Sequence, residues 1–378
     1  MATTKKKSAA KLPGFLARDG LQSLLDLLQA EGYETIGPVS KDGAIQYRPI
    51  SQLSDLPRGV QVEQASGSYR LLQGEGERLF DWANGPQALK PLLFAPREPL
   101  WRATKGEDGG LKFETIEPAP KPTAVIGLRA CDLAALALQD QHFLAGETAD
   151  THYQARRESL LLIGVDCSHP AATCFCTSTG DGPSLRSGFD IGLSELDEGF
   201  LLRSGSPRGK KLLAKLDLAP ATKQQLNQQT KAEQAAVKVQ TKGLPSRNLQ
   251  HALFTRLAPE HWEAVAKRCL ACGNCTAVCP TCFCYSVHAE PSLDASISEQ
   301  VRQWDSCFSE GHSALHRRPV RPDILTRYRQ WLTHKLGGWH AQYGRSGCVG
   351  CGRCISWCPA AIDIRDEVER IMVEACHE

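Results

Sequence analysis

The spacing of apolar residues predicts both helices and strands in the first part of the chain. Leucines recur at helical spacing in residues 21–30, which predicts an amphipathic helix with one buried face. Two uninterrupted apolar runs, residues 124–128 and 160–165, are typical of buried strands. A helix-like segment, residues 133–139, separates them, so together they predict a βαβ unit with parallel strands. We therefore expect an α/β domain over residues 13–215.

The pattern becomes polar after this domain. Residues 216–250 are dominated by Lys, Gln and Ala with few large apolar residues, which predicts a solvated helical connector. Helical spacing returns before the first cysteine motif and is interrupted near Pro259. We expect residues 251–378 to form a separate cysteine-rich domain, and residues 1–12, rich in Lys, Ala and Thr, to form a disordered tail.

Composition narrows the class of protein. The 378 residues carry a formal net charge of +2, which indicates neither nucleic acid nor an acidic membrane surface as a partner. No apolar run reaches the 18 or more residues that a membrane-spanning helix requires, and no secretory signal is evident. Sixteen cysteines without such a signal are typical of metal ligands in a reducing compartment, so we expect a cytoplasmic protein.

Two copies of one cysteine motif dominate the last third of the chain. Each copy has the spacing C-x2-C-x2-C-x3-C-P, the pattern that binds [4Fe–4S] clusters in bacterial ferredoxins. The first copy is Cys269, Cys272, Cys275 and Cys279, and the second is Cys348, Cys351, Cys354 and Cys358. Zinc sites also use C-x2-C pairs but not two runs of four, so the motifs favour iron–sulfur clusters over zinc.

The fourth cysteine of each motif is expected to bind the cluster of the other motif, as in two-cluster ferredoxins. Both motifs must then fold against each other, although about 80 residues separate them. Gly273 and Gly352 follow the second cysteine of each motif, where the backbone must approach the cluster closely. The expected ligands are Cys269, Cys272, Cys275 and Cys358 for the first cluster, and Cys348, Cys351, Cys354 and Cys279 for the second.

The segment between the motifs, residues 280–347, is much longer than in a small ferredoxin. Residues 327–335 are predicted to form an amphipathic helix, so this domain has the character of an α-helical dicluster ferredoxin. The fold class we expect is therefore α+β, an α/β domain followed by that helical domain. Residues 312–345 are rich in Arg and Lys, either as a solvated face that offsets the cluster charge or as a docking surface.

Four further cysteines belong to the first domain. Cys131 and Cys167 follow the two predicted parallel strands, at the sheet edge where open α/β proteins build their sites. Cys174 and Cys176 lie in the next loop, so four thiols could converge on a third [4Fe–4S] cluster. Packed reduced thiols and a zinc site are the alternatives, and His169 is a possible additional ligand.

The other cysteines carry weaker signals. Cys282, Cys284 and Cys307 could serve an incomplete or alternative site, but packing around a cluster and tuning of its potential is the interpretation we favour. Cys376 is expected to be incidental. Residues 73–76 resemble a phosphate loop superficially, yet lack its later glycine and its strand–helix frame, so a surface turn is the better prediction.

Several of these segments together resemble one protein family over roughly residues 60–365. The chain is similar to the β subunit of cytosolic multimeric [NiFe] hydrogenases of the sulfhydrogenase type, and to its relative, the corresponding electron-transfer subunit of anaerobic sulfite reductase. The matching segments are GLRACDL at 127–133, GVDC at 164–167, CFC at 174–176, CPTCFC at 279–284, WDSC at 304–307 and CVGCGRC at 348–354.

The resemblance implies an electron-transfer subunit in a hetero-oligomer. Its expected partners are a flavin subunit that uses NAD(P)H and a catalytic subunit, either the nickel–iron hydrogenase heterodimer or a siroheme sulfite reductase. The sequence itself shows no flavin or nicotinamide site and no convincing acid–base pair, which favours a non-catalytic carrier. The alternatives are an enzyme with its own organic cofactor, or a redox sensor with a DNA- or protein-binding module.

Overall fold

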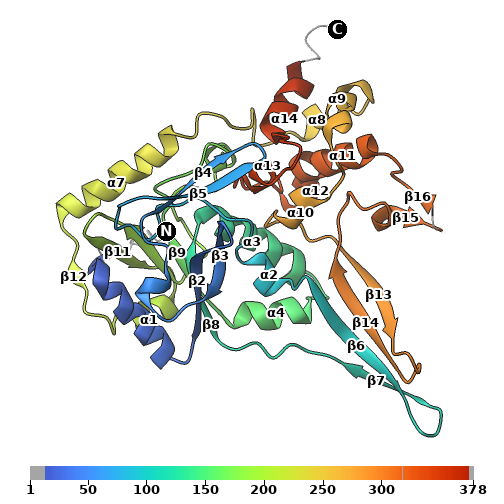
Figure 1. The fold of residues 1–378 in the computed structure, drawn as a ribbon, viewed down its shortest axis with the longest axis horizontal. Helices are drawn as coiled ribbons and strands as arrows, with labels where there is room; N and C mark the ends of the chain where they lie inside the picture. The colour runs from blue at the N-terminus through green and yellow to red at the C-terminus, as the bar shows by residue number, and fades with distance from the viewer. Residues whose placement is uncertain (1–12, 317, 374–378) are drawn as a thin grey trace, which may run out of the picture.

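The computed structural model describes residues 13–316 and 318–373. The predicted tail at residues 1–12, the basic residue Arg317 and Cys376 lie outside the described residues. Figure 1 shows a sheet-based N-terminal region, a helical region that holds both cysteine motifs, and a long paired-strand arm that projects away from them. The expected α+β class, with an α/β region followed by a helical dicluster region, is confirmed.

A mixed eight-stranded sheet organises the N-terminal region, in the order β12-β1-β11-β10-β9-β8-β2-β3. The central strands β10, β9, β8 and β2 run parallel, and the outer strands pair antiparallel. The strands of this sheet are β1 Gly14–Ala17, β2 Glu34–Lys41, β3 Ala44–Pro49, β8 Thr123–Leu128, β9 Leu160–Val165, β10 Ile191–Glu195, β11 Gly199–Ser204 and β12 Ala219–Pro220.

The predicted βαβ unit is confirmed. Strands β8 and β9 pair in parallel, with Val125 opposite Leu162, and both are almost wholly buried. Helix α3, Ala130–Leu144, and helix α4, Thr151–Glu158, connect them. The first predicted helix is also confirmed as α1, Leu21–Ala30, whose four periodic leucines are buried against the sheet.

The predicted connector contains helix α7, Lys223–Lys238, which begins with a capping box between Thr222 and Gln225. The helical segment that precedes the first motif is split, as expected, into α8, Gln250–Phe254, and α9, Glu260–Arg268, with Pro259 at the start of α9. The division of the chain into domains stays a prediction.

Helices surround both cysteine motifs. The short helices α10, Asn274–Ala277, and α13, Arg353–Ser356, lie within the first and second motif, and residues Gly273 and Gly352 precede them with positive φ. Between the motifs, helix α11, Ile324–Thr333, continues into a π-helical turn, His334–Gly338, as the amphipathic pattern predicts. Helix α12, Trp339–Tyr343, and helix α14, Ile364–Val373, complete this region.

The sequence pattern did not predict the projecting arm, a four-stranded antiparallel sheet in the order β13-β14-β6-β7. Strands β6, Arg97–Lys105, and β7, Leu111–Thr115, come from the N-terminal half, whereas β13, Tyr285–Pro291, and β14, Ile297–Trp304, lie between the two motifs. The segment between the motifs is therefore not helical throughout. Pairing of β14 with β6 joins the two halves of the chain directly.

The two faces of the arm differ in character. Trp101, Leu111 and Phe113 share one face by strand register, and the rings of Trp101 and Phe113 lie 5.7 Å apart. Leu111 and Phe113 are each 64% exposed. The opposite face carries charged residues, including the pair Arg102 and Glu299.

The remaining elements are short. They are α2 Lys90–Leu93, α5 Cys176–Thr179, α6 Pro207–Leu213, β4 Val60–Ala65, β5 Ser68–Gln73, β15 Ala314–Leu315, β16 Arg318–Pro319, and the 3-10 helices Arg18–Gly20, Leu53–Asp55 and Gly311–Ser313. Strands β4 and β5 form a hairpin that contacts α13. Within the described part of the chain, no helix combines the length and apolarity that a membrane crossing demands.

A buried ion-pair network holds the base of the arm. Glu98 of β6 accepts hydrogen bonds from Arg302 of β14 at 2.5 Å and from Arg156 of α4 at 2.6 Å. The side chains of Glu98 and Arg302 are 5% and 4% exposed. Burial would raise the pKa of Glu98, but the hydrogen bonds from Arg156 and Arg302 outweigh it and hold that pKa below its ordinary value.

Glu98→Gln should lower the free energy of unfolding by roughly 3 kcal/mol at pH 7, because it leaves buried arginines without their carboxylate. Wild type keeps this contribution above the ordinary glutamate pKa of about 4.3 and loses it as the pH falls through the lower folded-state pKa. The difference in the free energy of unfolding between wild type and Glu98→Gln should therefore become smaller at acidic pH. Urea unfolding at several pH values measures this difference. The control is Glu290→Gln, which removes an exposed ion pair with Arg97 and should lower the free energy of unfolding far less.

Candidate iron–sulfur centres

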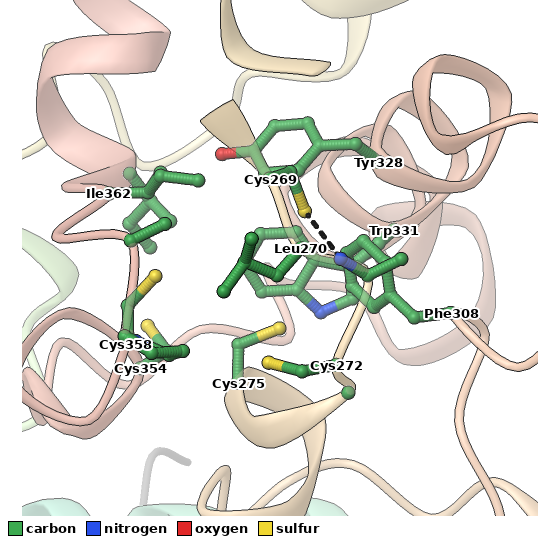
Figure 2. Close-up of a pocket in the computed structure, with 15 residues that line it drawn as sticks. Cys269, Leu270, Cys272, Cys275, Phe308, Tyr328, Trp331, Cys354, Cys358 and Ile362 are labelled. Atoms are coloured by element: carbon green, nitrogen blue, oxygen red, sulfur yellow. Dashed lines mark hydrogen bonds between the residues drawn. The ribbon is translucent and has the colours of Figure 1, made fainter. Parts of the chain in front are cut away.

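The first cysteine motif and the last cysteine of the second line one pocket. Cys269 and Cys272 come from the loop between α9 and α10, Cys275 lies in the first turn of α10, and Cys358 follows α13. In Figure 2, Cys354 and Cys358 lie on one side of the pocket, opposite Cys272 and Cys275. The structure thus brings together the four thiols that the crossed pattern assigns to one cluster.

The walls of this pocket are apolar. Phe308, Tyr328 and Trp331 enclose it from the segment between the motifs, and Ile362 and Ile364 from the chain after the second motif (Figure 2). The backbone N–H of Ala271 donates to the sulfur of Cys269 at 3.4 Å. These apolar side chains shield the inner side of the pocket from water, while Cys272 at its rim is exposed. Such a setting suits a cluster whose ligands all come from the protein.

The thiols of the pocket interact electrostatically. Burial raises the pKa of Cys275, and the nearby Cys269, Cys358 and Cys272 raise it further. Burial likewise raises the pKa of Cys269. A group of thiols that disfavour each other's ionisation requires a cationic centre to become thiolates together, which is what bound iron supplies.

The second thiol group comprises Cys279, Cys348, Cys351 and Cys354. The pKa of Cys354 is raised by burial and then by the thiols of Cys348, Cys351 and Cys279, which shows that the four lie close together. Burial raises the pKa of Cys348 to about 12, and the N–H of Gly350 donates to its sulfur at 3.4 Å. The assignment of these four thiols to the second cluster stays a prediction.

Two buried lysines lie beside this group. Lys335 donates to the hydroxyl of Thr281 at 2.9 Å; burial would lower its pKa, but Cys279 and Cys282 raise it above the ordinary value. Lys90 donates to the carbonyls of Thr276 and Ala277 at the end of the first motif. Both cations offset negative charge on the thiols from inside the protein.

The four N-terminal cysteines line a separate cavity. Cys131 lies in the first turn of α3, Cys167 follows β9, and Cys174 and Cys176 lie at the start of α5. Asn84 donates to the sulfur of Cys131 at 3.2 Å. The remaining lining residues include Arg129, Pro170, Pro183, Gly350 and Cys351, the last two from the second motif. His169 does not line the cavity; its ring pairs with Asp81 and is half exposed.

Glycines let the second motif approach this cavity. A side chain at Gly350, which has φ of +65°, would lie 2.6 Å from the backbone of Cys176. A side chain at Gly352 would meet the carbonyl oxygen of Thr173 at the same distance. The N–H of Phe175 donates to the oxygen of Gly350 at 2.8 Å. Gly352 therefore serves the contact with the N-terminal loop, which the sequence analysis did not foresee.

A buried ion pair fixes the same contact. Arg353 of the second motif donates to Asp132 at 2.8 Å and to the carbonyl of Gly85 at 2.9 Å. Both side chains of the Arg353–Asp132 pair are 1% exposed. Asp132 also accepts from the backbone N–H of Arg129 at the start of α3. The pair sets Cys131, next to Asp132, beside Cys351.

The three thiol groups are arranged in an order. Cys354 belongs to the second group and also lines the first pocket. Cys351 belongs to the second group and also lines the N-terminal cavity. The second group therefore lies between the other two.

The described cysteines outside these three groups lie at two different positions in the structure. Cys282 is buried and lies close enough to Cys279 to shift its pKa, whereas Cys284 interacts in the same way with Cys307. The sequence analysis treated these three as one set.

The basic stretch is not a uniform solvated face. Lys335 is buried, and Arg327 is also buried with its guanidinium donating to backbone carbonyls, among them that of Phe308. Sequence reasoning missed Lys335, Lys90 and Arg353, because an isolated cation in a polar segment gives no sign of burial. Only the position of Arg353 inside a cysteine motif was a usable signal.

Comparisons with known proteins agree with this geometry. The profile of the 4Fe-4S dicluster domain family matches residues 268–362, which implies two [4Fe–4S] clusters. The chain is 31% identical to Sulfhydrogenase 2 subunit beta of Pyrococcus furiosus over 296 residues, covering 75% of this chain and 83% of that protein. No solved structure matches significantly.

Arg353→Met should lower the free energy of unfolding by roughly 3–5 kcal/mol, because it leaves the carboxylate of Asp132 buried without its cation. Urea unfolding followed by circular dichroism measures the loss. Adding Asp132→Asn to the same chain should recover part of the stability by removing the unpaired charge. Losses that simply add in the double variant would show that the two side chains do not depend on each other.

Proposed function

Because the chain belongs to the family of the sulfhydrogenase β subunits, we propose that it is the iron–sulfur electron-transfer subunit of a multisubunit oxidoreductase. In this proposal it relays electrons between a flavin subunit that uses NAD(P)H and the catalytic heterodimer of a [NiFe] hydrogenase. The relative at 31% identity favours the hydrogenase over the siroheme sulfite reductase as the catalytic partner. The chain itself would not be catalytic.

The proposed ligands follow the crossed pattern. Cys269, Cys272, Cys275 and Cys358 would hold one [4Fe–4S] cluster, and Cys348, Cys351, Cys354 and Cys279 the other. When bound, such clusters supply one-electron transfer at potentials set by charge, hydrogen bonds and exposure. Residues of this chain would influence both potentials. The apolar side chains of Tyr328 and Trp331 shield one site from water, and Lys335 places a cation beside the other.

The order of the three thiol groups is the observation that carries the relay. A subunit with a single redox centre must carry electrons by docking with donor and acceptor in turn, whereas consecutive centres give electrons a route through the subunit. Cys351 and Cys354 each lie at a junction between two groups, so adjacent sites share a wall. This arrangement supports entry at one end and exit at the other.

We also propose that the N-terminal cavity holds a third [4Fe–4S] cluster. Its donor set consists of four thiols, Cys131, Cys167, Cys174 and Cys176, which suits such a cluster. Packed reduced thiols and zinc are the competing interpretations. Burial raises the pKa of Cys174 and Cys131, so free thiols here would stay protonated and inert.

Reconstitution tests the relay. The chain is combined with a flavin partner and a hydrogenase heterodimer, and NAD(P)H-dependent hydrogen production is measured together with iron content. Cys275→Ser should remove or convert one cluster, with a loss of up to about four irons, and should abolish transfer. Cys284→Ser, which alters a cysteine outside the three groups, is the matched control and should keep the iron. Full transfer by the Cys275→Ser variant would refute the ligand assignment and the relay.

Iron and acid-labile sulfide per chain test the third cluster. The anaerobically purified protein should contain about twelve irons, and Cys174→Ala about eight. Electron paramagnetic resonance of the reduced samples should show the matching loss of one signal. The control His169→Gln should keep all the iron, since its ring faces Asp81. About eight irons in the unaltered protein would leave the N-terminal cysteines as structural thiols.

A further inference from the structure

Cys284 and Cys307 meet at the base of the arm. Cys284 directly precedes β13 and Cys307 follows β14, so the pairing of these strands brings the two cysteines together. The N–H of Asp305 donates to the carbonyl of Cys284 at 3.0 Å, and the thiols of Cys284 and Cys307 are close enough to shift each other's pKa. Both residues are partly exposed, in contrast to the buried Cys282.

A histidine and a carboxylate complete this group. The ring of His312 contacts Asp305 through Nδ1 at 3.1 Å, and it lies close enough to Cys284 that the two groups shift each other's pKa. Asp305 therefore orients the ring, and the ring lies against the sulfur. Thiol nucleophiles are activated by this arrangement, in which a carboxylate orients a histidine and the histidine lies beside the cysteine.

The charges of the group divide the two thiols into different roles. Hydrogen bonds from Cys307 and His312 lower the pKa of Cys284, while the pKa of Cys307 is raised. The titratable side chains near Cys284 include His312, Asp305 and Lys335. Lys90, His142 and His334 also interact with it electrostatically. Opposite pKa shifts favour a thiolate on Cys284 and a protonated thiol on Cys307, the combination found in dithiols that exchange with disulfides.

This pair is separate from the three thiol groups. Neither cysteine lines the first pocket or the N-terminal cavity. It is nevertheless adjacent to the first motif: Thr276 donates to Ser306 at 2.8 Å, and Phe308, next to Cys307, lines the first pocket. A role in cluster ligation is therefore unnecessary for these thiols, and their own chemistry becomes relevant.

We propose that Cys284 and Cys307 form a redox-active dithiol that undergoes exchange with low-molecular-weight disulfides. The Cys284 thiolate attacks one sulfur of the disulfide RSSR, the S–S bond breaks, and RS⁻ leaves and takes the proton held by His312. Cys307 then loses its proton to solvent and attacks the mixed disulfide, releasing a second thiolate that is protonated in turn. RSSR gains two electrons and two protons, and the chain gains the Cys284–Cys307 disulfide.

Mass spectrometry of the full chain with its clusters tests this proposal. The anaerobic protein is exposed to oxidised glutathione, free thiols are blocked, and the peptides are analysed without reductant. Wild type should yield a peptide pair that links Cys284 to Cys307 and is lighter by two hydrogens. Cys307→Ser should instead trap glutathione on Cys284, because the resolving thiol is absent. Cys282→Ser is the matched control and should still form the link.

His312→Gln tests the positioning residue. We expect the exchange rate at pH 7 to fall roughly tenfold, and the pH at which the rate is half-maximal to rise, because the thiolate loses its cationic partner. A purely structural role for His312 would lower the rate equally at all pH values and would contradict the assignment.

Two further results would contradict the proposal that Cys284 and Cys307 form a redox-active dithiol. Absence of the Cys284–Cys307 link from wild type is one, and loss of a cluster's iron in Cys284→Ser or Cys307→Ser is the other. The first result leaves the relay intact, since iron content and hydrogen production are measured separately.

Discussion

The buried ion pair between Arg353 and Asp132 is the constraint on which the arrangement of the thiol groups depends. Both charges have been removed from water, and each would be strongly unfavourable without the other. The pair can form only when the second cysteine motif lies against the first turn of α3. That placement brings Cys351 to the cavity of the N-terminal cysteines and makes three separate thiol groups continuous.

The remaining charges of this region serve the same arrangement. Thiolates gathered in a small volume repel each other, and the protein places Lys335 and Lys90 beside them rather than at the surface. Arg353 adds a third cation, which interacts with Cys351 of the second group. Internal cations make the charged forms of the sulfurs less unfavourable and raise the potential at which a bound cluster accepts an electron.

Local patterns in the sequence were sufficient for much of the fold. The leucine spacing of α1, the apolar runs of β8 and β9 and the cysteine spacing of both motifs report structure formed by neighbouring residues. The crossed thiol groups also follow from spacing, because both motifs have one geometry.

Contacts between distant segments were not readable in the same way. Strand β14 finds its partner β6 about 200 residues away, and its mixed polar pattern contains no information about that partner. The burial of Lys335 and the separation of Cys284 from Cys282 depend equally on packing by segments far along the chain. The proximity of Cys131 to Cys351 required the tertiary contact of Arg353, which a single sequence cannot indicate.

The pairing of β14 with β6 has a consequence for how the polypeptide is made. When the ribosome has produced β6 and β7, the strand that completes their sheet has not yet been translated. One edge of β6 stays unpaired until β14 has emerged, and unpaired edges of this kind promote aggregation. The second cysteine motif follows β14 in the chain, so the two crossed thiol groups can be completed only after that vulnerable interval has ended, whereas the four N-terminal cysteines are synthesised before it. For the two crossed groups, synthesis thus places strand closure before metal loading.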